Sequence, residues 1–111
     1  MTRPTVTPPP SEPVALTDAD ALDFLDRHEV ALLAFLAPDD GPSDRLRPRL
    51  ALAAAKMGEP RLGVGVLDVD RHPLVADAVG VKSAPTTLVF VRGEVTDRLV
   101  GAVPQDVLEA T

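Results

Sequence analysis

The side chains best placed for chemistry lie in one short segment, directly after a long apolar run. They are three carboxylates and a hydroxyl in a turn rich in glycine and proline, namely Asp39, Asp40, Ser43 and Asp44. Such carboxylates can cap a helix or bind a hard cation, and a hydroxyl becomes a nucleophile only beside a base. The chain has no cysteine, which excludes thiolate catalysis, disulfides and cysteine metal sites.

The elements that must position this turn are a strand and a helix. The apolar run over residues 30–37 is bounded by turn residues, which is typical of a strand buried on both faces. Asp40, Gly41 and Pro42 predict a helix start, because a carboxylate caps free N–H groups and proline suits the first turn. Pro48 lies inside the helix expected over residues 42–56 and should bend it. The turn therefore lies at the carboxyl end of a strand, where open α/β sheets usually place their sites.

The rest of the chain alternates strands and helices. Further strands are expected over residues 14–16, 62–68, 87–91 and 95–100, and further helices over 17–28, over 73–79 and from Pro104 onward. Helical crossovers imply parallel strand pairs, and a tight turn at Arg92-Gly93 implies a closing antiparallel hairpin. The prediction is an α/β fold with a mixed five-stranded sheet and about four helices, in the order βαβαβαββα.

Caps and apolar stripes define the two longer helices. Thr17 is the expected N-cap of the first helix, whose apolar residues Leu22, Phe24 and Leu25 could face a core. The second helix has an apolar stripe made of Leu46, Leu50, Leu52 and Ala53.

The turn and its flanks resemble the active-site segment of the thioredoxin family. That segment has a strand ending in Phe-Trp-Ala, then Cys-Gly-Pro-Cys, then a helix kinked by proline. Here Phe35-Leu36-Ala37 precedes Asp40-Gly41-Pro42-Ser43, and Pro48 stands where the kinking proline should. The central Gly-Pro is kept and both cysteines are replaced.

Three further segments resemble the same family. They are its cis-proline loop, its Asp-x-x-Pro turn and its Val-Gly-Ala sequence, which correspond to Ser83-Ala84-Pro85-Thr86, residues 68–73 and Leu99-Val100-Gly101-Ala102. The resemblance implies a thioredoxin fold over residues 14–111, with a cis peptide bond before Pro85. Residues 1–13, which are rich in proline, are predicted to be a disordered tail, with a docking segment as the alternative.

The resemblance also indicates which chemistry has been lost. Asp40 and Ser43 replace the two cysteines, Ala34 replaces the family's buried aspartate, and Val66 replaces the lysine that accompanies it. Ser43 would need a base to act as a nucleophile. His28 is expected at the end of the first helix, and His72 in a turn at the opposite end of the strands. We therefore predict no enzymatic activity of its own, no metal and no cofactor, with Asp40 serving mainly as a replacement N-cap.

Charge and hydropathy exclude other classes of function. The net charge is −6 with both signs interspersed, which argues against a nucleic-acid partner, and Arg45, Arg47 and Arg49 are expected to form a solvated helix face. No apolar run approaches the roughly 20 residues that span a bilayer. The N-terminus lacks the pattern of a signal peptide, so the prediction is a cytoplasmic protein without a membrane segment. The expectation of a bacterial protein comes only from the resemblance to hydrogenase-maturation proteins of bacteria.

The resemblance also implies a groove that binds an extended peptide. Its expected members come from three segments, Asp39, Asp40 and Pro42, then Ala84 and Pro85, then Gly101 and Ala102. The main hypothesis is a non-redox monomer that binds an extended peptide or partner protein as a chaperone or assembly factor, of the kind used in hydrogenase maturation. One alternative is a protein of the thiol–disulfide pathway that acts with a borrowed thiol or a partner. Another is a purely structural domain.

Overall fold

The computed structural model describes residues 13–57 and 62–110 and contains the expected strands and helices in the expected order. The bounds are β1 (Val14–Ala15), α1 (Ala21–Arg27), β2 (Val30–Leu36), α2 (Gly41–Met57), β3 (Leu62–Asp68), α3 (Pro73–Ala78), β4 (Thr86–Val91), β5 (Glu94–Val100) and α4 (Gln105–Glu109). The predicted α/β class and the order βαβαβαββα are confirmed. Most of the predicted tail lies outside the described residues.

The five strands form one mixed sheet in the order β1-β3-β2-β4-β5. β3 is parallel to both β1 and β2, whereas β4 is antiparallel to β2 and to β5. β2 therefore lies at the centre, and its side chains from Ala31 to Leu36 are all buried. Burial on both faces explains why this strand is continuously apolar.

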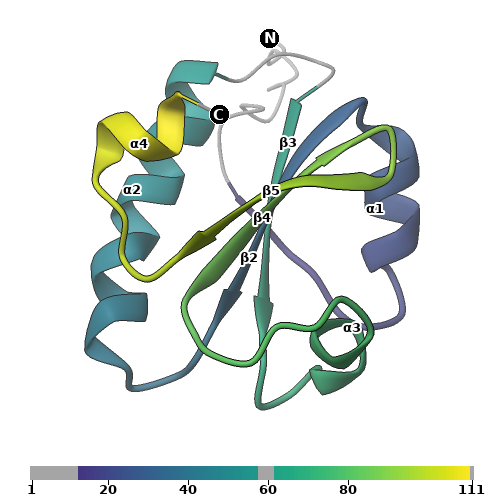
Figure 1. Ribbon diagram of the computed structural model, residues 1–111, viewed down its shortest axis with the longest axis horizontal. Coiled ribbons are helices and arrows are strands. Elements are labelled where there is room, and N and C mark those ends of the chain that lie inside the picture. Colours follow the sequence, from purple (N-terminus) through teal and green to yellow (C-terminus); the bar gives the residue numbers. More distant parts are fainter. Residues whose placement is uncertain (1–12, 58–61, 111) are drawn as a thin grey trace, which may run out of the picture.

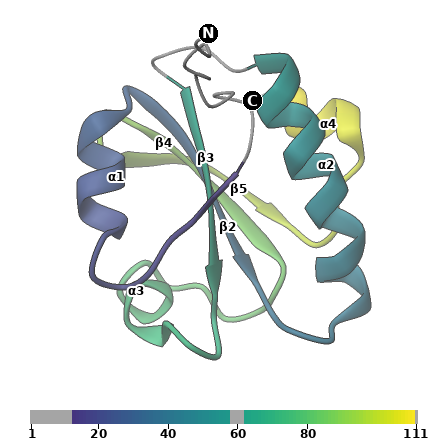
Figure 2. The same cartoon turned by 180° about the vertical axis from the view of Figure 1, so that it is seen from behind.

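Two helices cover each face of the sheet (Figures 1 and 2). α1 and α3 lie on one face, where Phe24 and Ala76 pack against Leu33 and Phe35. α2 and α4 lie on the other, where Leu46, Leu50 and Leu108 pack against Leu32 and Leu36. Alternation along β2 thus divides the core into two layers, one on each side of the sheet.

Four strands begin or end at the same edge of this sheet: β2, β3 and β5 end there, and β4 begins there. Leu36 at the end of β2 is level with Asp68 at the end of β3. Thr86 at the start of β4 is level with Phe35 and with Val100 at the end of β5. The turn before α2, the turn before α3, the Pro85 loop and the segment after β5 all leave the sheet at this edge. In both views the first two of these turns lie at the same end of the molecule (Figures 1 and 2).

The start of α1 differs from the prediction. The helix begins at Ala21, because the Thr17 hydroxyl accepts hydrogen bonds from the N–H groups of Ala19 and Asp20 in a turn before it. Asp18 does not support α1 either, since its carboxylate accepts hydrogen bonds from the N–H groups of Leu74 and Val75 at the start of α3.

Two leucines expected in the core are exposed. Leu22 is 74% exposed because Ala21, Phe24 and Leu25 form the buried face of α1. Leu52 is 47% exposed, because the buried stripe of α2 follows Leu46, Leu50, Ala53 and Ala54. In each case the neighbouring alanine, Ala21 or Ala53, faces the core instead. Successive residues of a helix point about 100° apart, so the leucine beside each alanine points toward solvent. Within the described residues, no helix is long and apolar enough to cross a membrane.

Candidate functional site

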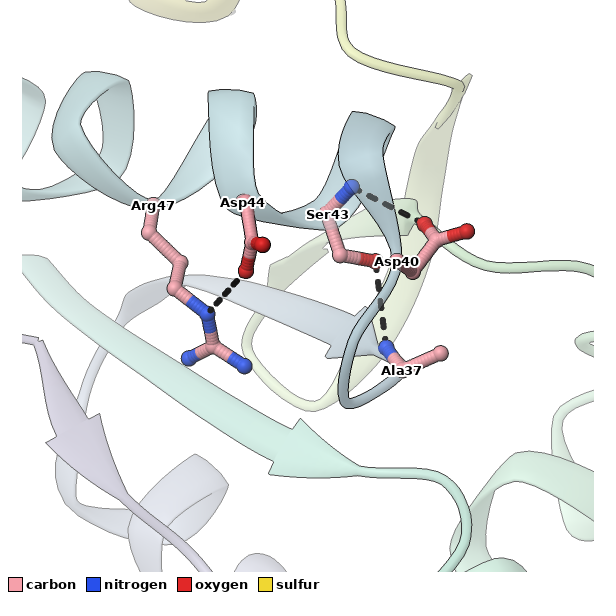
Figure 3. A network of polar contacts seen from close by, with 5 residues as sticks. All are labelled: Ala37, Asp40, Ser43, Asp44 and Arg47. Carbon is pink, nitrogen blue, oxygen red and sulfur yellow. Dashed lines mark hydrogen bonds and ion pairs between the residues drawn. The ribbon is translucent and has the colours of Figure 1, made fainter.

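The turn between β2 and α2 is closed by hydrogen bonds among its own residues. Asp40 Oδ2 accepts a hydrogen bond from the Ser43 N–H at 2.9 Å, which makes Asp40 the N-cap of α2. The Ser43 hydroxyl accepts a hydrogen bond from the Ala37 N–H at 3.1 Å, as Figure 3 shows. Asp39 supports the turn with a φ of 55°, a left-handed conformation that aspartate tolerates better than most residues. The turn therefore holds its shape without sulfur.

Ser43 is not arranged as a nucleophile. Its side chain is fully buried, and among the described residues it has no hydrogen bond to either histidine. His28 lies at the far end of β2, where its Nδ1 is 2.9 Å from the carbonyl oxygen of Phe24. His72 lies at the same edge as Asp40, contrary to the prediction, because it follows β3 and β3 is parallel to β2.

The interior on the α2 face of β2 lacks the acid that the family places there. Ala34 is fully buried and is level with Val66 on β3 and with Thr87 on β4. Thr87 is also fully buried, and its hydroxyl has no hydrogen-bond partner within the described part of the chain. Thr87 gives no signal in the sequence, because only the register across the sheet places it opposite Ala34.

The loop before β4 is joined to the segment after β5. The Ala84–Pro85 peptide bond is cis, and Pro85 is buried. The Gly101 N–H donates to the Pro85 carbonyl oxygen at 2.8 Å, and Gly101 has a φ of 90°, which suits glycine. Ala84 is half-buried, and its own N–H and C=O form no hydrogen bond with the described residues. One backbone donor and one acceptor are therefore left beside this loop.

Arg49 connects α2 to the same region. Its Nη1 donates hydrogen bonds to the carbonyl oxygens of Ala102 and Val103, both at 2.8 Å. The expectation that Arg49 belongs to a solvated helix face is wrong, because its side chain is half-buried against the segment after β5. Arg45 and Arg47 are exposed as expected.

The acidic residues of the turn are used within the protein. Asp40 caps α2, and Asp44 forms an ion pair with Arg47, with Oδ1 3.7 Å from Nε (Figure 3). In residues 13–57 and 62–110 there is no group of three or more histidine or acidic side chains that could hold a metal ion.

The sequence of this chain is similar to the sequences of known proteins. The sequence matches the family profile described as Thioredoxin over residues 13–111. The chain belongs to the thioredoxin family. It is 33% identical over 97 residues to thioredoxin from Porphyra purpurea, covering 86% of this chain and 90% of that protein. Thioredoxin 1 from Nostoc sp. is 34% identical over 89 residues, covering 80% and 82% of the two chains.

A solved structure supports the same assignment. A mutant thioredoxin from Halobacterium salinarum NRC-1 superimposes with a TM-score of 0.83 at 30% identity, covering 95% of this chain and 91% of that one. The predicted thioredoxin fold is therefore confirmed, with five strands and four helices.

These relatives correct the main functional hypothesis. The relatives named above are thioredoxins, and none of them is described as a chaperone or an assembly factor. The hypothesis of a non-redox chaperone or assembly factor is wrong on this comparison, and the alternative in the thiol–disulfide pathway is favoured. Lacking cysteine, the thioredoxin-family chain has no thiol of its own for that exchange.

Proposed function

We propose that this thioredoxin-family protein takes part in thiol–disulfide exchange with a thiol that another molecule supplies. In this proposal the protein binds the extended segment that carries the disulfide, and glutathione or a cysteine of a partner protein reacts with it. The observation that carries the proposal is the unpaired backbone of Ala84, which lies beside the buried Pro85 and forms no hydrogen bond with the described residues.

The first support comes from the turn before α2. Asp40 and Ser43 replace the reactive cysteines, yet each is fixed by a short hydrogen bond within the turn. The surface that faces a substrate is therefore kept in a defined conformation although its sulfur atoms are gone.

The second support is the chemistry of the proposed groove. Ala84 offers one N–H and one C=O, which suit pairing with the backbone of an extended peptide. Gly101 and Ala102 have small side chains, and Arg49 and Pro85 hold them in place through hydrogen bonds. The turn that follows β2 leaves the sheet at the edge where β4 begins, and in this proposal its residues Asp39, Asp40 and Pro42 form the remaining side of the groove.

The exchange itself balances without any residue of this chain. Two thiols of glutathione reduce one bound disulfide, giving oxidised glutathione and two substrate thiols. The first glutathione thiolate attacks one substrate sulfur, forms a mixed disulfide with it and releases the other substrate sulfur as a thiolate. The second thiolate attacks the glutathione sulfur of the mixed disulfide, forms oxidised glutathione and releases the remaining substrate thiolate. The protein contributes orientation of the disulfide, which lowers the entropic part of the barrier. As part of the same proposal, it acts as a monomer on a protein partner in the bacterial cytoplasm.

A turnover assay with glutathione tests this function. We expect the protein to increase the rate at which glutathione reduces insulin disulfides, with a rate that saturates as insulin is raised. Ala84→Arg should abolish the increase, because the arginine side chain would cover the proposed groove. Ala78→Arg, on the exposed side of α3, is the matched control and should keep it.

Two results would contradict the proposal. One is no increase over glutathione alone. The other is an increase that survives Ala84→Arg. The double variant Asp40→Cys with Ser43→Cys is the positive control, because the start of α2 lowers the pKa of a thiol placed there. It should reduce insulin with dithiothreitol, and a folded but inactive double variant would count against substrate binding in this groove.

A further inference from the structure

A pocket of about 200 Å³ opens at the carboxyl ends of β1, β2 and β3. Its apolar lining consists of Ala15, Leu16, Leu36, Val66 and Leu67, and the nitrogen-bearing side chains of Arg47, Arg71 and His72 lie on its other side. It lies on the β3 side of β2, whereas the Ala84 loop lies on the β4 side. The pocket is therefore separate from the proposed peptide groove.

The position of the pocket follows from the connections of the sheet. β2 and β3 are parallel neighbours, but β2 leads into α2 on one face and β3 leads into α3 on the other. Helices that leave in opposite directions open a crevice at the carboxyl ends of the two strands. Open α/β sheets commonly bind ligands at such a crossing point.

The nitrogen donors of the pocket form few contacts within the protein. Arg47 forms one ion pair, in which its Nε lies 3.7 Å from Asp44 Oδ1. The two terminal nitrogens of Arg47 have no partner among the described residues. The guanidinium of Arg71 and the ring nitrogens of His72 likewise have no hydrogen bond or ion pair within residues 13–57 and 62–110. Several donors are thus available for a ligand.

The nearby carboxylates are turned toward the backbone. Asp68 lines the pocket, but its Oδ1 accepts hydrogen bonds from the N–H groups of Asp70 at 2.9 Å and Arg71 at 3.3 Å. Asp18 accepts hydrogen bonds from two N–H groups at the start of α3. Neither carboxylate forms an ion pair with Arg47 or Arg71 within the described residues, so both guanidinium groups can bind a ligand.

We propose that this pocket binds a small organic phosphate monoester. The planar guanidinium groups of Arg47 and Arg71 suit the oxygens of a doubly charged phosphate, and His72 adds a further donor. Ala15 and Val66, the exposed and half-buried apolar residues of the lining, would receive the organic part of the ligand. Because pockets for drug-sized ligands have volumes of about 300–1,000 Å³, this one suits a small molecule. The inference is independent of the proposed thiol–disulfide function.

Nuclear magnetic resonance titration of the full chain with phenyl phosphate tests the site. We expect saturable shifts of the amide signals of Leu16, Leu36 and His72, which surround the pocket. Inorganic phosphate should bind more weakly, because it has no apolar part to contact Ala15 and Val66. Benzoate should also bind more weakly, because it carries a single charge.

Two variants and one matched control test which arginines bind the phosphate. Arg71→Gln and Arg47→Gln should each weaken phenyl phosphate binding about tenfold, the effect of one charge-assisted contact. Arg45→Gln makes the same charge change on α2 but does not line the pocket, so its affinity should stay within about twofold. The insulin assay should be unchanged in all three variants, which separates this site from the groove.

Three outcomes would overturn the inference. The first is a titration with no saturable shift near the pocket. The second is an Arg45→Gln variant weakened as much as Arg71→Gln, since that would indicate only a diffuse effect of charge. The third is benzoate binding as tightly as phenyl phosphate, which would exclude recognition of the phosphate.

Discussion

Arg49 and Ala102 are 53 residues apart in the sequence, and a hydrogen bond of 2.8 Å joins the arginine Nη1 to the alanine carbonyl oxygen. A second bond of the same length joins Nη1 to the Val103 carbonyl oxygen. Gln105 completes the contact, because its side-chain amide donates to the Arg49 carbonyl oxygen at 2.9 Å. α2 is thereby fastened to the segment that carries Gly101 and Ala102 on one side of the proposed groove.

Replacing Arg49 should loosen this side of the groove. We expect Arg49→Met to lower the free energy of unfolding by about 1.5–3 kcal/mol, because two hydrogen bonds to a charged group are lost. Arg49→Lys should recover part of the loss, since an ammonium group is a single point of donation. Urea unfolding followed by circular dichroism measures the change, and faster amide exchange at Ala102 should accompany it. Unchanged unfolding of Arg49→Met would contradict this structural role.

The N-cap of α2 gives a second prediction. Asp40→Ala removes the acceptor for the Ser43 N–H and should cost about 0.5–2 kcal/mol of unfolding free energy. Asp40→Asn should retain most of the stability, because its side-chain oxygen can accept the same bond. Asp44→Ala is the matched control, and removal of its exposed ion pair should cost less than Asp40→Ala. Thermal unfolding of the three variants distinguishes a cap from a general effect of charge, and equal losses in Asp40→Ala and Asp44→Ala would exclude the cap.

Two neighbouring threonines on β4 should respond in opposite directions to the same substitution. The buried Thr87 hydroxyl has no partner among the described residues, so Thr87→Val should stabilise the protein by about 1 kcal/mol. The Thr86 hydroxyl donates to the Ser83 carbonyl oxygen at 2.7 Å, so Thr86→Val should destabilise it by about as much. For a domain of this size, each change corresponds to a shift of roughly 4–8 °C in Tm. Shifts of the same sign would show that Thr87 has a partner in solution.

The elements of the fold could be predicted wherever the signal was local. The apolar runs of β2 and β3 have buried neighbours on both sides, so their sequence alone predicts a strand. Thr17 was wrongly predicted to be the N-cap of α1, because several residues before this helix could cap it. Asp18 caps α3, more than fifty residues away, and no local pattern could reveal that choice.

Some residues of the candidate site could likewise be predicted from local sequence, and others could not. The cap formed by Asp40 is local, and the sequence predicted it. Thr87 depends on the register between β2 and β4, and Arg49 on the packing of α2 against the segment after β5. His72 was placed at the wrong end although the helical crossover from β2 to β3 already implied parallel strands, whose carboxyl ends lie at the same edge. Residues whose role depends on pairing across the sheet were therefore missed.

Acid should weaken the contact between α2 and α4 through Glu109. The Gln105 side-chain amide donates to Glu109 Oε2 at 2.7 Å, and Lys56 Nζ lies 3.1 Å from Oε1. The hydrogen bond from Gln105, followed by that from Lys56, lowers the pKa of Glu109 below its ordinary value of 4.5. A carboxyl group whose pKa is lowered by folding stabilises the protein above that ordinary value, and the contribution is lost as the pH falls through the folded value.

The difference in unfolding free energy between the wild type and Glu109→Gln should therefore become smaller as the pH falls. At neutral pH we expect the variant to be the less stable protein, and below pH 4.5 the two unfolding curves should converge. Lys56→Gln removes the second cause and should reduce, without abolishing, the pH dependence assigned to Glu109. Urea unfolding by circular dichroism over this range measures the effect, because the chain has no tryptophan or tyrosine for fluorescence. A constant difference between wild type and Glu109→Gln at every pH would mean that the carboxylate gains nothing from Gln105 and Lys56 in the folded protein.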